Sequence, residues 1–390
     1  MSSWIEVSEE RLAGNFRAVT DAAGAETEVL AVVKANAYGH GADVCAVALA
    51  RAGARWLGVA CASEGAPVRR ALDTAGFAGE RAPEILVLCG LMAEDVAVVV
   101  EHGLTPVVWT REQAEWLRGA GVAVHVEVDT GMGRQGVREG ADLGALLDTI
   151  GAAGLVLDGA MTHFLAAEVV GSEKTREQER RFAGVIAQIR ERGLRPKWVH
   201  AGSSSTVDNP ARDSAWLPEL AKSVGAQAMM RSGIALYGYC LPIEGADAGM
   251  GPRIRAKVKP VMQWKTRVLD VREVSVGETV GYNATFTAPG PMRLALLPVG
   301  YSDGLRRELS STNERPGGWV VIRGHRAAVV GRVSMNLTLV DVTGIDGVRL
   351  GDEVLLLGDG ATADDHARVA GTISYEILCG ARAGQEAVIV

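Results

Sequence analysis

The chain has 390 residues, of which 48% are hydrophobic and 22% charged, so it is long enough for two domains with sizeable buried cores. Its formal net charge of -7 and the lack of a Lys/Arg-rich run argue against non-specific binding of nucleic acid. The lack of a basic and apolar leader, of a long uncharged apolar window and of paired cysteines predicts a cytoplasmic protein without signal peptide, membrane span, disulfides or zinc site.

Short apolar runs alternate with longer amphipathic stretches along the first two-thirds of the chain, after a short strand expected at Trp4–Val7. Eight further strands are expected at Glu28–Ala35, Trp56–Cys61, Glu84–Cys89, Thr105–Trp109, Ala123–Val128, Leu155–Thr162, Lys197–Ala201 and Ala228–Tyr237. Helices between them are expected at Ala42–Arg51, Glu64–Ala75, Arg111–Arg118 and Lys174–Arg192. This alternation predicts an α/β fold, a TIM (β/α)8 barrel. A doubly wound open sheet is the alternative, which the lack of a GxGxxG after a first strand disfavours.

The sequence changes in character near residue 240. Residues 241–260 are rich in Gly and Pro, which is typical of a linker. The β-type runs that follow are Val261–Val271, Arg293–Pro298, Trp319–Ile322, Ala327–Val333, Leu337–Val342, Glu353–Leu357 and Glu386–Val390. They predict a smaller all-β C-terminal domain. We therefore expect residues 1–8 to form a strand that pairs with this β-domain, residues 9–243 to form the barrel, and residues 244–390 to form the β-domain.

The first barrel strand is expected to end in the segment Ala31-Val-Val-Lys34-Ala-Asn-Ala-Tyr38-Gly39-His40-Gly41. A barrel carries its active site at the carboxyl ends of its strands. A lysine there is partly removed from water, which favours the neutral amine that can form a Schiff base. A lone lysine at a strand end is more often a surface residue, so the prediction depends on the whole run.

Four more polar motifs lie at the ends of later barrel strands. They are Val128-Asp-Thr-Gly-Met-Gly-Arg134-Gln-Gly, Met161-Thr-His163-Phe164, His200-Ala-Gly-Ser-Ser204-Ser-Thr and Arg231-Ser-Gly233-Ile234-Ala-Leu-Tyr237-Gly. Taken singly, His163 could be a core histidine and Ser204 a turn residue. Because all these motifs end strands of one barrel, together they predict an active site at its rim.

The Lys34 segment closely resembles the cofactor-attachment signature of alanine racemases, which use pyridoxal phosphate. The resemblance implies that Lys34 holds the cofactor covalently and that Tyr38 contacts its phosphate. For the later barrel motifs it implies a set of cofactor and substrate contacts. These are Arg134 near the phenolic oxygen and the substrate carboxylate, His163 in the catalytic network, Ser204, Gly233 and Ile234 at the phosphate, and Arg231 at the pyridine nitrogen.

Four segments of the β-domain carry the same resemblance, which thus covers essentially the whole chain. They are Val280-Gly-Tyr282-Asn-Ala-Thr-Phe, Val299-Gly-Tyr301-Ser-Asp-Gly, Gly331-Arg-Val-Ser-Met335-Asn336 and Ser374-Tyr375-Glu376. The resemblance implies that Tyr282 is the second catalytic base and that Tyr301 lines the substrate entrance. It further implies that the Met335 backbone binds the substrate carboxylate and that Tyr375 closes over the phosphate.

The implied reaction places one base on each face of a planar intermediate, with Lys34 acting on D-alanine and Tyr282 on L-alanine. Because an isolated tyrosine is protonated at neutral pH, a chain Tyr282–His163–Arg231 is expected to favour its phenolate. Arginine only donates hydrogen bonds, so Arg231 would leave the cofactor nitrogen unprotonated. The resemblance also implies a head-to-tail homodimer, in which each β-domain completes the site of the other subunit, and a supply of D-alanine for peptidoglycan.

Three positions depart from the family pattern. Glu127 stands where many members have a carbamylated lysine, and we expect its carboxylate to hold Arg134. The alternative is a buried strand residue that pairs elsewhere. Asn336 stands where aspartate is common, which removes a negative charge near the entrance, and Glu168 also replaces a common aspartate. These departures leave substrate breadth, for example toward serine, open.

The same residues argue against several other functions. A basic-amino-acid decarboxylase would have a carboxylate at the cofactor nitrogen and would lack the Gly-Tyr-Asn-Ala-Thr segment. Broad-specificity racemases are usually exported, and Tyr375 would crowd a large side chain. A non-enzymatic cofactor-binding barrel would lack the β-domain and hence Tyr282. A purely structural barrel would leave the five rim motifs unexplained.

Overall fold

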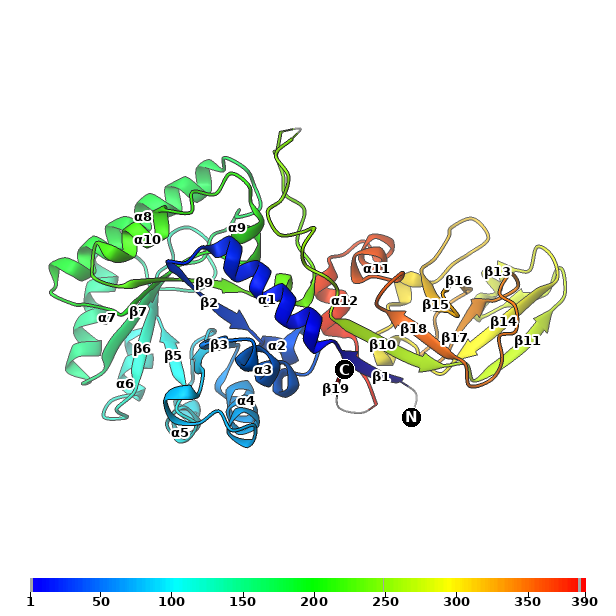
Figure 1. The fold of residues 1–390 in the computed structure, drawn as a ribbon, viewed down its shortest axis with the longest axis horizontal. Coiled ribbons are helices and arrows are strands. Elements are labelled where there is room, and N and C mark those ends of the chain that lie inside the picture. Colours follow the sequence, from blue (N-terminus) through cyan, green and yellow to red (C-terminus); the bar gives the residue numbers. More distant parts are fainter. Residues whose placement is uncertain (1–2, 248, 385–386) are drawn as a thin grey trace. The chain divides into compact units, whose positions relative to one another are not determined.

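The computed structural model describes residues 3–247, 249–384 and 387–390. The chain folds into two compact units. The first, called the barrel unit below, comprises residues 10–35 and 45–259. The second, the sheet unit, comprises residues 1–9, 36–44 and 260–390 (Figure 1).

Eight parallel strands of the barrel unit form a closed barrel, which confirms the predicted TIM barrel. The last strand pairs with the first, so that the sheet has no open edge. Their apolar side chains are almost all buried, as expected for parallel strands covered on both faces. The strands are β2 (Thr27–Val32), β3 (Trp56–Val59), β4 (Glu84–Val87), β5 (Thr105–Val108), β6 (Ala123–Glu127), β7 (Val156–Met161), β8 (Trp198–His200) and β9 (Gln227–Ser232).

Helices lie outside this ring of strands (Figure 1). The longest begins after Ser172, whose hydroxyl accepts the Thr175 N–H, and it buries Phe182, Ile186 and Ile189 at helical spacing. The helices are α1 (Glu9–Ala23), α2 (Lys34–Tyr38), α3 (Ala42–Arg51), α4 (Ala62–Thr74), α5 (Val96–Glu101), α6 (Arg111–Trp116), α7 (Ala141–Ala152), α8 (Glu173–Glu191), α9 (Ser204–Asp208) and α10 (Trp216–Lys222).

The stretch expected as a linker remains part of the barrel unit, so the units divide at residue 259 and not at residue 243. The buried Asp208 carboxylate accepts the backbone N–H groups of Ile254 (2.9 Å) and Arg255 (3.0 Å). Asn15 both donates to the Lys259 carbonyl (2.8 Å) and accepts its N–H (2.8 Å). These contacts join segments far apart in sequence, which composition alone does not reveal.

A nine-stranded, mostly antiparallel sheet forms the core of the sheet unit, in the order β11-β14-β17-β16-β15-β18-β10-β1-β19. The N-terminal strand β1 pairs antiparallel with β10 along its whole length. The strands are β1 (Ser3–Val7), β10 (Met262–Arg267), β11 (Asp270–Val274), β14 (Met292–Leu297), β15 (Trp319–Ile322), β16 (His325–Val330), β17 (Thr338–Asp341), β18 (Glu353–Leu357) and β19 (Val388–Ile389), with β12 (Thr279–Val280) and β13 (Phe286–Thr287) as a separate pair.

The sheet unit also contains two helices that the β-type pattern did not predict, α11 (Ala363–Ala370) and α12 (Ser374–Gly380). A capping box precedes α11, because the Thr362 hydroxyl accepts the Asp365 N–H at 3.1 Å. The expected strand 261–271 is divided into β10 and β11. The expected last strand, 386–390, begins at a residue outside the described ones.

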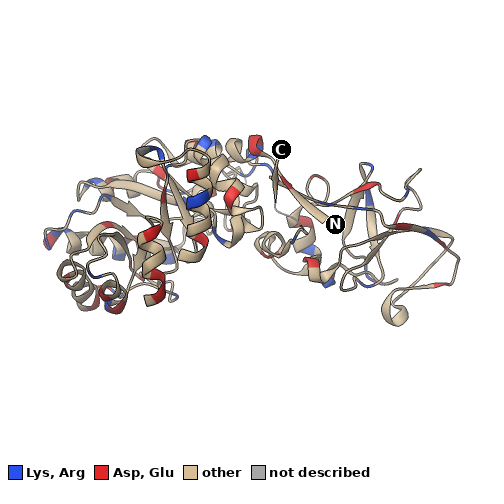
Figure 2. Ribbon diagram, turned by 90° about the horizontal axis from the view of Figure 1, so that it is seen from below, with Lys and Arg blue, Asp and Glu red and all other residues tan. Residues whose placement is uncertain are grey.

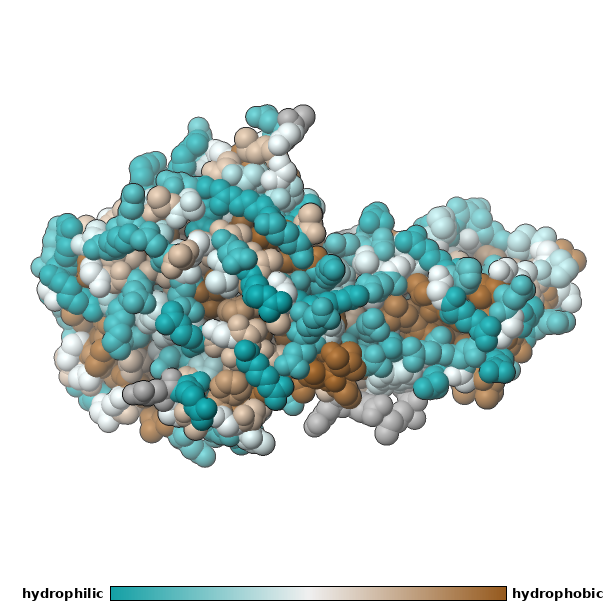
Figure 3. Space-filling view, viewed as in Figure 1, coloured by the Kyte–Doolittle hydropathy of each residue, from teal (hydrophilic) through white to brown (hydrophobic). Residues whose placement is uncertain are grey.

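Acidic and basic residues are interspersed over both units (Figure 2). Hydrophilic residues cover most of the face of the barrel unit seen in Figure 3. Within the described ranges, no helix is long and apolar enough to cross a membrane.

Candidate active site

The strand ends of the barrel unit gather the polar residues of the five rim motifs. Lys34 and His163 each lie two residues beyond a strand, β2 and β7. Ser204 begins α9 after β8, Arg231 lies near the end of β9, and Arg134 lies in the loop after β6. Because the carboxyl ends of parallel barrel strands form one rim, these residues share the face on which barrel enzymes carry their active sites.

Arg231 is the centre of the polar contacts at this rim. Its buried guanidinium donates from one terminal nitrogen to His200 Nδ1 (3.1 Å). The other terminal nitrogen donates to the Thr162 carbonyl (2.7 Å) and to His163 Nδ1 (3.1 Å). A guanidinium only donates, so both Nδ1 atoms are acceptors and each neutral ring carries its proton on Nε2.

Burial and the surrounding positive charges keep the ring of His163 neutral. Burial lowers the pKa of His163 to about 3, and the positive charges of Arg231, Arg134 and Lys34 act in the same direction. Burial also lowers the pKa of Arg231 to about 10, which leaves the guanidinium charged near neutral pH. The positive charge of this pair therefore belongs to Arg231, and His163 presents an Nε2–H donor.

Hydrogen-bond donors converge on the Ser204 hydroxyl. Its Oγ accepts the backbone N–H groups of Gly233 (3.0 Å) and Ala235 (3.2 Å), and it lies 3.1 Å from Ser232 Oγ. Ile234, between the two amides, is buried. Clustered backbone N–H groups and hydroxyls are the donor set that a bound phosphate requires, so this cluster could hold an anionic group.

Lys34 begins a helical turn of unusual handedness. The four residues that follow it in α2 all have φ between 52° and 53°. Left-handed backbone costs L-residues about 1–2 kcal/mol each, and such strain is concentrated at functional sites. The Glu64 carboxylate holds the start of the turn, because it accepts the N–H groups of Ala35 (2.9 Å) and Ala60 (2.8 Å).

Glu127 does not hold Arg134 in the way expected from the sequence. Its carboxylate accepts from Gln135 Nε2 at 2.5 Å, and the same nitrogen donates to the Leu88 carbonyl at 3.0 Å. Among the described residues, no hydrogen bond or ion pair joins Glu127 to Arg134. Gln135 takes the position next to the buried carboxylate, whereas Arg134 lies beside a narrow gap that Glu127 and His163 also line. Burial raises the pKa of Glu127, against the effects of Gln135, Arg231 and Arg134.

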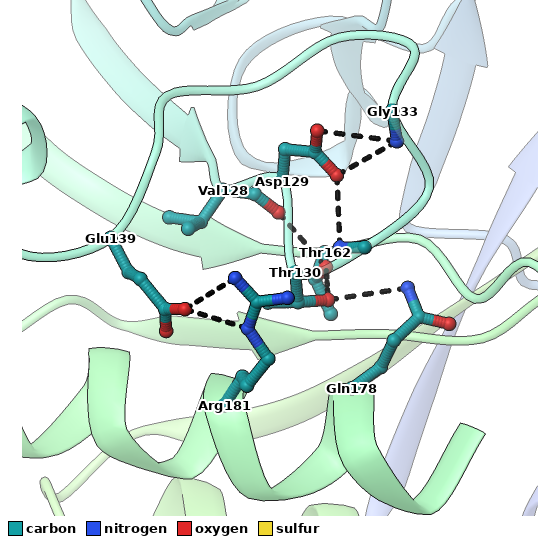
Figure 4. A network of polar contacts seen from close by, with 9 residues as sticks. Val128, Asp129, Thr130, Gly133, Glu139, Thr162, Gln178 and Arg181 are labelled. Carbon is teal, nitrogen blue, oxygen red and sulfur yellow. Dashed lines mark hydrogen bonds and ion pairs between the residues drawn. The ribbon is translucent and has the colours of Figure 1, made fainter. Parts of the chain in front are cut away.

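A buried glutamine of α8 ties together the loops that follow β6 and β7 (Figure 4). Gln178 Nε2 donates to the His163 carbonyl (2.9 Å) and to Thr130 Oγ1 (3.3 Å). The Thr162 hydroxyl donates to the Val128 carbonyl (2.9 Å), so the Thr130 hydroxyl donates to Thr162 Oγ1 (2.7 Å). The backbone of His163 is thus fixed to the loop that carries Arg134.

The same loop is ordered by two acidic side chains (Figure 4). The Asp129 carboxylate accepts the N–H groups of Gly131 (3.0 Å) and Gly133 (3.0 Å). Further along, Glu139 accepts from Arg181 of α8 at 2.6 Å. The turn before Arg134 therefore has its own internal hydrogen bonds, and the segment after Arg134 is anchored on a long helix.

The remaining predicted residues belong to the sheet unit. The rings of Tyr38 and Tyr375 lie side by side, with centroids 5.9 Å apart. Burial raises the pKa of Tyr38, and its neighbour Tyr375 adds to the effect. The two tyrosines expected at a phosphate are therefore brought together within one unit.

Tyr301 and Met335 lie on two interlocked loops. The Tyr301 N–H donates to the Ser334 carbonyl (3.0 Å), and the Ser302 N–H donates to the Met335 carbonyl (3.0 Å). Asn336 Nδ2 donates to Ser302 Oγ at 2.7 Å, and that hydroxyl donates to the Met335 carbonyl at 2.8 Å. A carboxylate at position 336 could not donate in this way, so the asparagine has a structural consequence as well as an electrostatic one.

Tyr282 is 67% exposed and lies at a strained turn. The next two residues, Asn283 (φ 61°) and Ala284 (φ 49°), have left-handed backbone. A large exposed aromatic ring contributes little to the core of its own unit, and backbone strain next to it points to a role in binding or chemistry.

Three residues of this rim were given no role by the sequence: Glu64, Gln178 and His200. For Gln178 a signal existed, because it precedes Phe182 by four residues on the buried stripe of α8 and so is a polar residue at an apolar position. His200 lies near the end of the predicted strand Lys197–Ala201 and begins the motif that contains Ser204. Glu64 had no such signal, because among the described residues it hydrogen-bonds only to backbone N–H groups, those of Ala35 and Ala60 near the ends of β2 and β3.

Comparison with known proteins covers both units. A family model described as alanine racemase, N-terminal domain, matches residues 7–241, and one described as alanine racemase, C-terminal domain, matches residues 261–388. The alanine racemase of Symbiobacterium thermophilum is 36% identical over 389 residues, which cover 97% of this chain and 94% of that protein. Both domains are matched, which a single-barrel cofactor-binding protein would not show.

Solved structures of alanine racemases are also similar to this chain over its whole length. The alanine racemase from Streptomyces coelicolor is similar with a TM-score of 0.84 at 32% identity, covering 100% of this chain and 98% of that chain. The alanine racemase from Bartonella henselae, solved with covalently bound pyridoxal phosphate, is similar with a TM-score of 0.79 at 26% identity and covers 100% of both chains.

Replacing Gln178 with leucine should destabilise the barrel unit by about 2 kcal/mol or more, because the His163 carbonyl and the Leu165 N–H lose buried partners. Gln188→Leu on the same helix is the matched control, since its bond to the Gly140 carbonyl is at the surface. Urea unfolding of the purified variants measures the difference. An equal loss of unfolding free energy in the two variants would contradict the role of Gln178 in joining the loops after β6 and β7.

Stability should fall as the pH drops below the ordinary histidine pKa of 6.5, because unfolded His163 takes up a proton that the native ring accepts only near pH 3. The contribution is fully present above pH 6.5 and decreases by about 1.4 kcal/mol per pH unit below it. Urea unfolding of wild type and His163→Gln at pH 8, 7, 6 and 5 tests this. The variant should show the shallower decline below pH 6, and parallel curves would refute the assignment.

Proposed function

The chain belongs to the alanine racemase family, and from this premise we propose that it interconverts L-alanine and D-alanine with pyridoxal phosphate as cofactor. The observation that carries the proposal is the rim of the barrel unit. This rim carries three groups at the ends of β2, β8 and β9. They are the amine of Lys34, a cluster of hydrogen-bond donors around Ser204 that suits a phosphate, and the buried guanidinium of Arg231. The reaction class is thus an isomerisation at an amino-acid α-carbon.

The residues present fit this cofactor chemically. Lys34 supplies an amine for its aldehyde, and Ser204 with the Gly233 amide supplies donors for its phosphate. We assign Ile234, Tyr38 and Tyr375 to the same phosphate. Arg231 supplies hydrogen-bond donors and no acceptor for the pyridine nitrogen. When bound, pyridoxal phosphate delocalises the electron pair left on the α-carbon.

Two side chains of this chain would move the α-proton. Lys34 acts as the base for D-alanine and Tyr282 as the base for L-alanine, and each returns a proton in the opposite direction. His163 supports Tyr282, because its only ring proton is on Nε2 and can be donated to a phenolate. Arg231, through its bond to His163 Nδ1, fixes that tautomer.

Substrate recognition is assigned to three further residues. Arg134 lies near His163, and its forked guanidinium suits a carboxylate. The backbone of Met335 takes part in holding that carboxylate, and Tyr301, on the interlocked neighbouring loop, lines the entrance.

We further infer a homodimer in which the sheet unit of one subunit completes the barrel site of the other. Tyr282, Met335 and Tyr301 are 67%, 56% and 43% exposed within the single chain. Tyrosine and methionine are enriched in protein interfaces, so exposed side chains of these types are suited to contact a second subunit. The product D-alanine would supply peptidoglycan synthesis in the cytoplasm.

Purified protein with pyridoxal phosphate should convert L-alanine into D-alanine faster than it converts serine, arginine or lysine. Chiral chromatography of reactions with each single L-enantiomer measures this. Lys34→Ala should abolish the conversion, since it removes both the attachment amine and one base. Preferential conversion of arginine or lysine would instead indicate a broad-specificity racemase, and no conversion of any amino acid would refute the proposed activity.

The shared site can be tested by complementation between two inactive variants. In a mixed dimer of Lys34→Ala and Tyr282→Phe subunits, one of the two sites receives both native bases. Statistical mixing makes half of the dimers mixed, so about a quarter of the wild-type activity should return. Activity is assayed after co-expression from two differently tagged genes, with each variant alone as control. If the bases came from one subunit, no activity would return.

A further inference from the structure

Two neighbouring histidines, His125 and His200, lie inside the barrel, and the proposed reaction gives neither of them a role. His125 of β6 and His200 of β8 are both fully buried. His125 Nδ1 lies 2.8 Å from His200 Nε2, and the rings meet edge to face with centroids 4.9 Å apart. Buried polar rings in a barrel core are costly unless they are hydrogen-bonded, so the contact requires an explanation.

The positions of the ring protons follow from Arg231. Its guanidinium donates to His200 Nδ1, so the proton of the neutral His200 ring is on Nε2. His200 Nε2–H then donates to His125 Nδ1, which leaves the proton of His125 on its own Nε2. These hydrogen bonds therefore run in one direction, with Arg231 donating to His200 and His200 donating to His125.

This series of polar contacts ends at the carboxylate of Asp158. Asp158 of β7 is 6% exposed, and its Oδ2 faces His125 Nε2 at 3.5 Å. That distance is long for a hydrogen bond, but the negative charge favours a proton on the nitrogen that faces it. The other oxygen pairs with the exposed amine of Lys197 at 3.0 Å.

The backbone is shaped to allow this contact. Along the β6–β7 pair, Val124 is opposite Leu157 but His125 is opposite Gly159, so Asp158 is an extra residue in β7. Such bulges re-aim a side chain. A Cβ on Gly159 would lie only 2.4 Å from His125 Nδ1, so the ring has its place only because this residue is glycine.

We propose that Asp158 and His125 are positioning residues of the active site. The Asp158 carboxylate fixes the proton of His125 on Nε2, which fixes the tautomer of His200 and keeps its Nδ1 as the acceptor that holds Arg231. The inference rests on the proposed function, because Arg231 is placed there at the cofactor nitrogen and at His163. The groups that face the two rings are Asp158, Arg231 and, through the carboxylate, Lys197.

The proton positions can be measured without reference to activity. Holoenzyme labelled with ¹⁵N-histidine gives the tautomer of each ring by long-range ¹H–¹⁵N correlation, with His125→Gln and His200→Gln used for assignment. We expect both rings to be neutral with the proton on Nε2, and unchanged from pH 5.5 to 8.5. A proton on Nδ1 of His200, or titration of either ring in this range, would overturn the proposal.

The role of the carboxylate is tested with Asp158→Asn, whose amide can donate to His125 Nε2 and so favours the opposite tautomer. We expect the His125 and His200 signals to shift toward the Nδ1–H form, and kcat for alanine to fall about tenfold with KM changed less than about twofold, as for loss of an orienting partner. Asp158→Glu should restore both properties. Lys197→Met, which removes only the exposed ion pair, should leave both unchanged.

The outcomes separate the two proposals. If Asp158→Asn keeps the wild-type histidine tautomers, or changes them without changing kcat, the positioning role is refuted while the racemase activity stands. If wild type shows the expected tautomers but racemises no amino acid, the proposed function fails and the assigned proton order remains. Should Asp158→Asn not fold, the wild-type tautomers still decide the proton order.

Discussion

The site depends on one buried cation. Arg231 is 5% exposed inside the barrel, and among the described residues no carboxylate forms an ion pair with it. Removing a charge from water is costly unless hydrogen bonds replace its hydration. Three acceptors do so, the Thr162 carbonyl and the Nδ1 atoms of His163 and His200. Because arginine only donates, its presence determines the protonation of its neighbours, and its two terminal nitrogens divide the three acceptors between them, which the single nitrogen of a lysine could not do.

The surrounding fold holds these acceptors in place by backbone contacts. Thr162 and His163 follow β7, and Gln178 fixes the His163 carbonyl from α8. Lys34 is held differently, because the turn that follows it is left-handed and would be unstable in isolation. Glu64 holds the N–H that begins this turn. A strand thus carries the buried guanidinium of Arg231, while left-handed backbone occurs in the short turns next to Lys34 and Tyr282.

The sequence predicted the barrel well because each strand is a short apolar run and each rim motif directly follows one. The partner of Glu127 was not predictable, because Gln135 and Arg134 are adjacent and only the loop conformation decides which of them reaches the carboxylate. Similarly, the boundary at residue 259 depends on bonds from Asp208 and Asn15, which lie far away in sequence. The local sequence pattern thus specifies helices and strands, whereas tertiary hydrogen bonds decide which side chains pair and where a unit ends.

The electrostatic character of the rim differs from that of the whole chain. The chain carries a formal net charge of -7, yet Lys34, Arg134 and Arg231 all act on His163 as positive charges. The buried Glu127 counters them in part, and burial raises its pKa. A locally positive recess in a negatively charged protein attracts small anionic groups while the rest of the surface repels them. A cofactor phosphate and an amino-acid carboxylate are such groups, so the same charges that keep His163 neutral also favour the ligands that the proposed reaction needs.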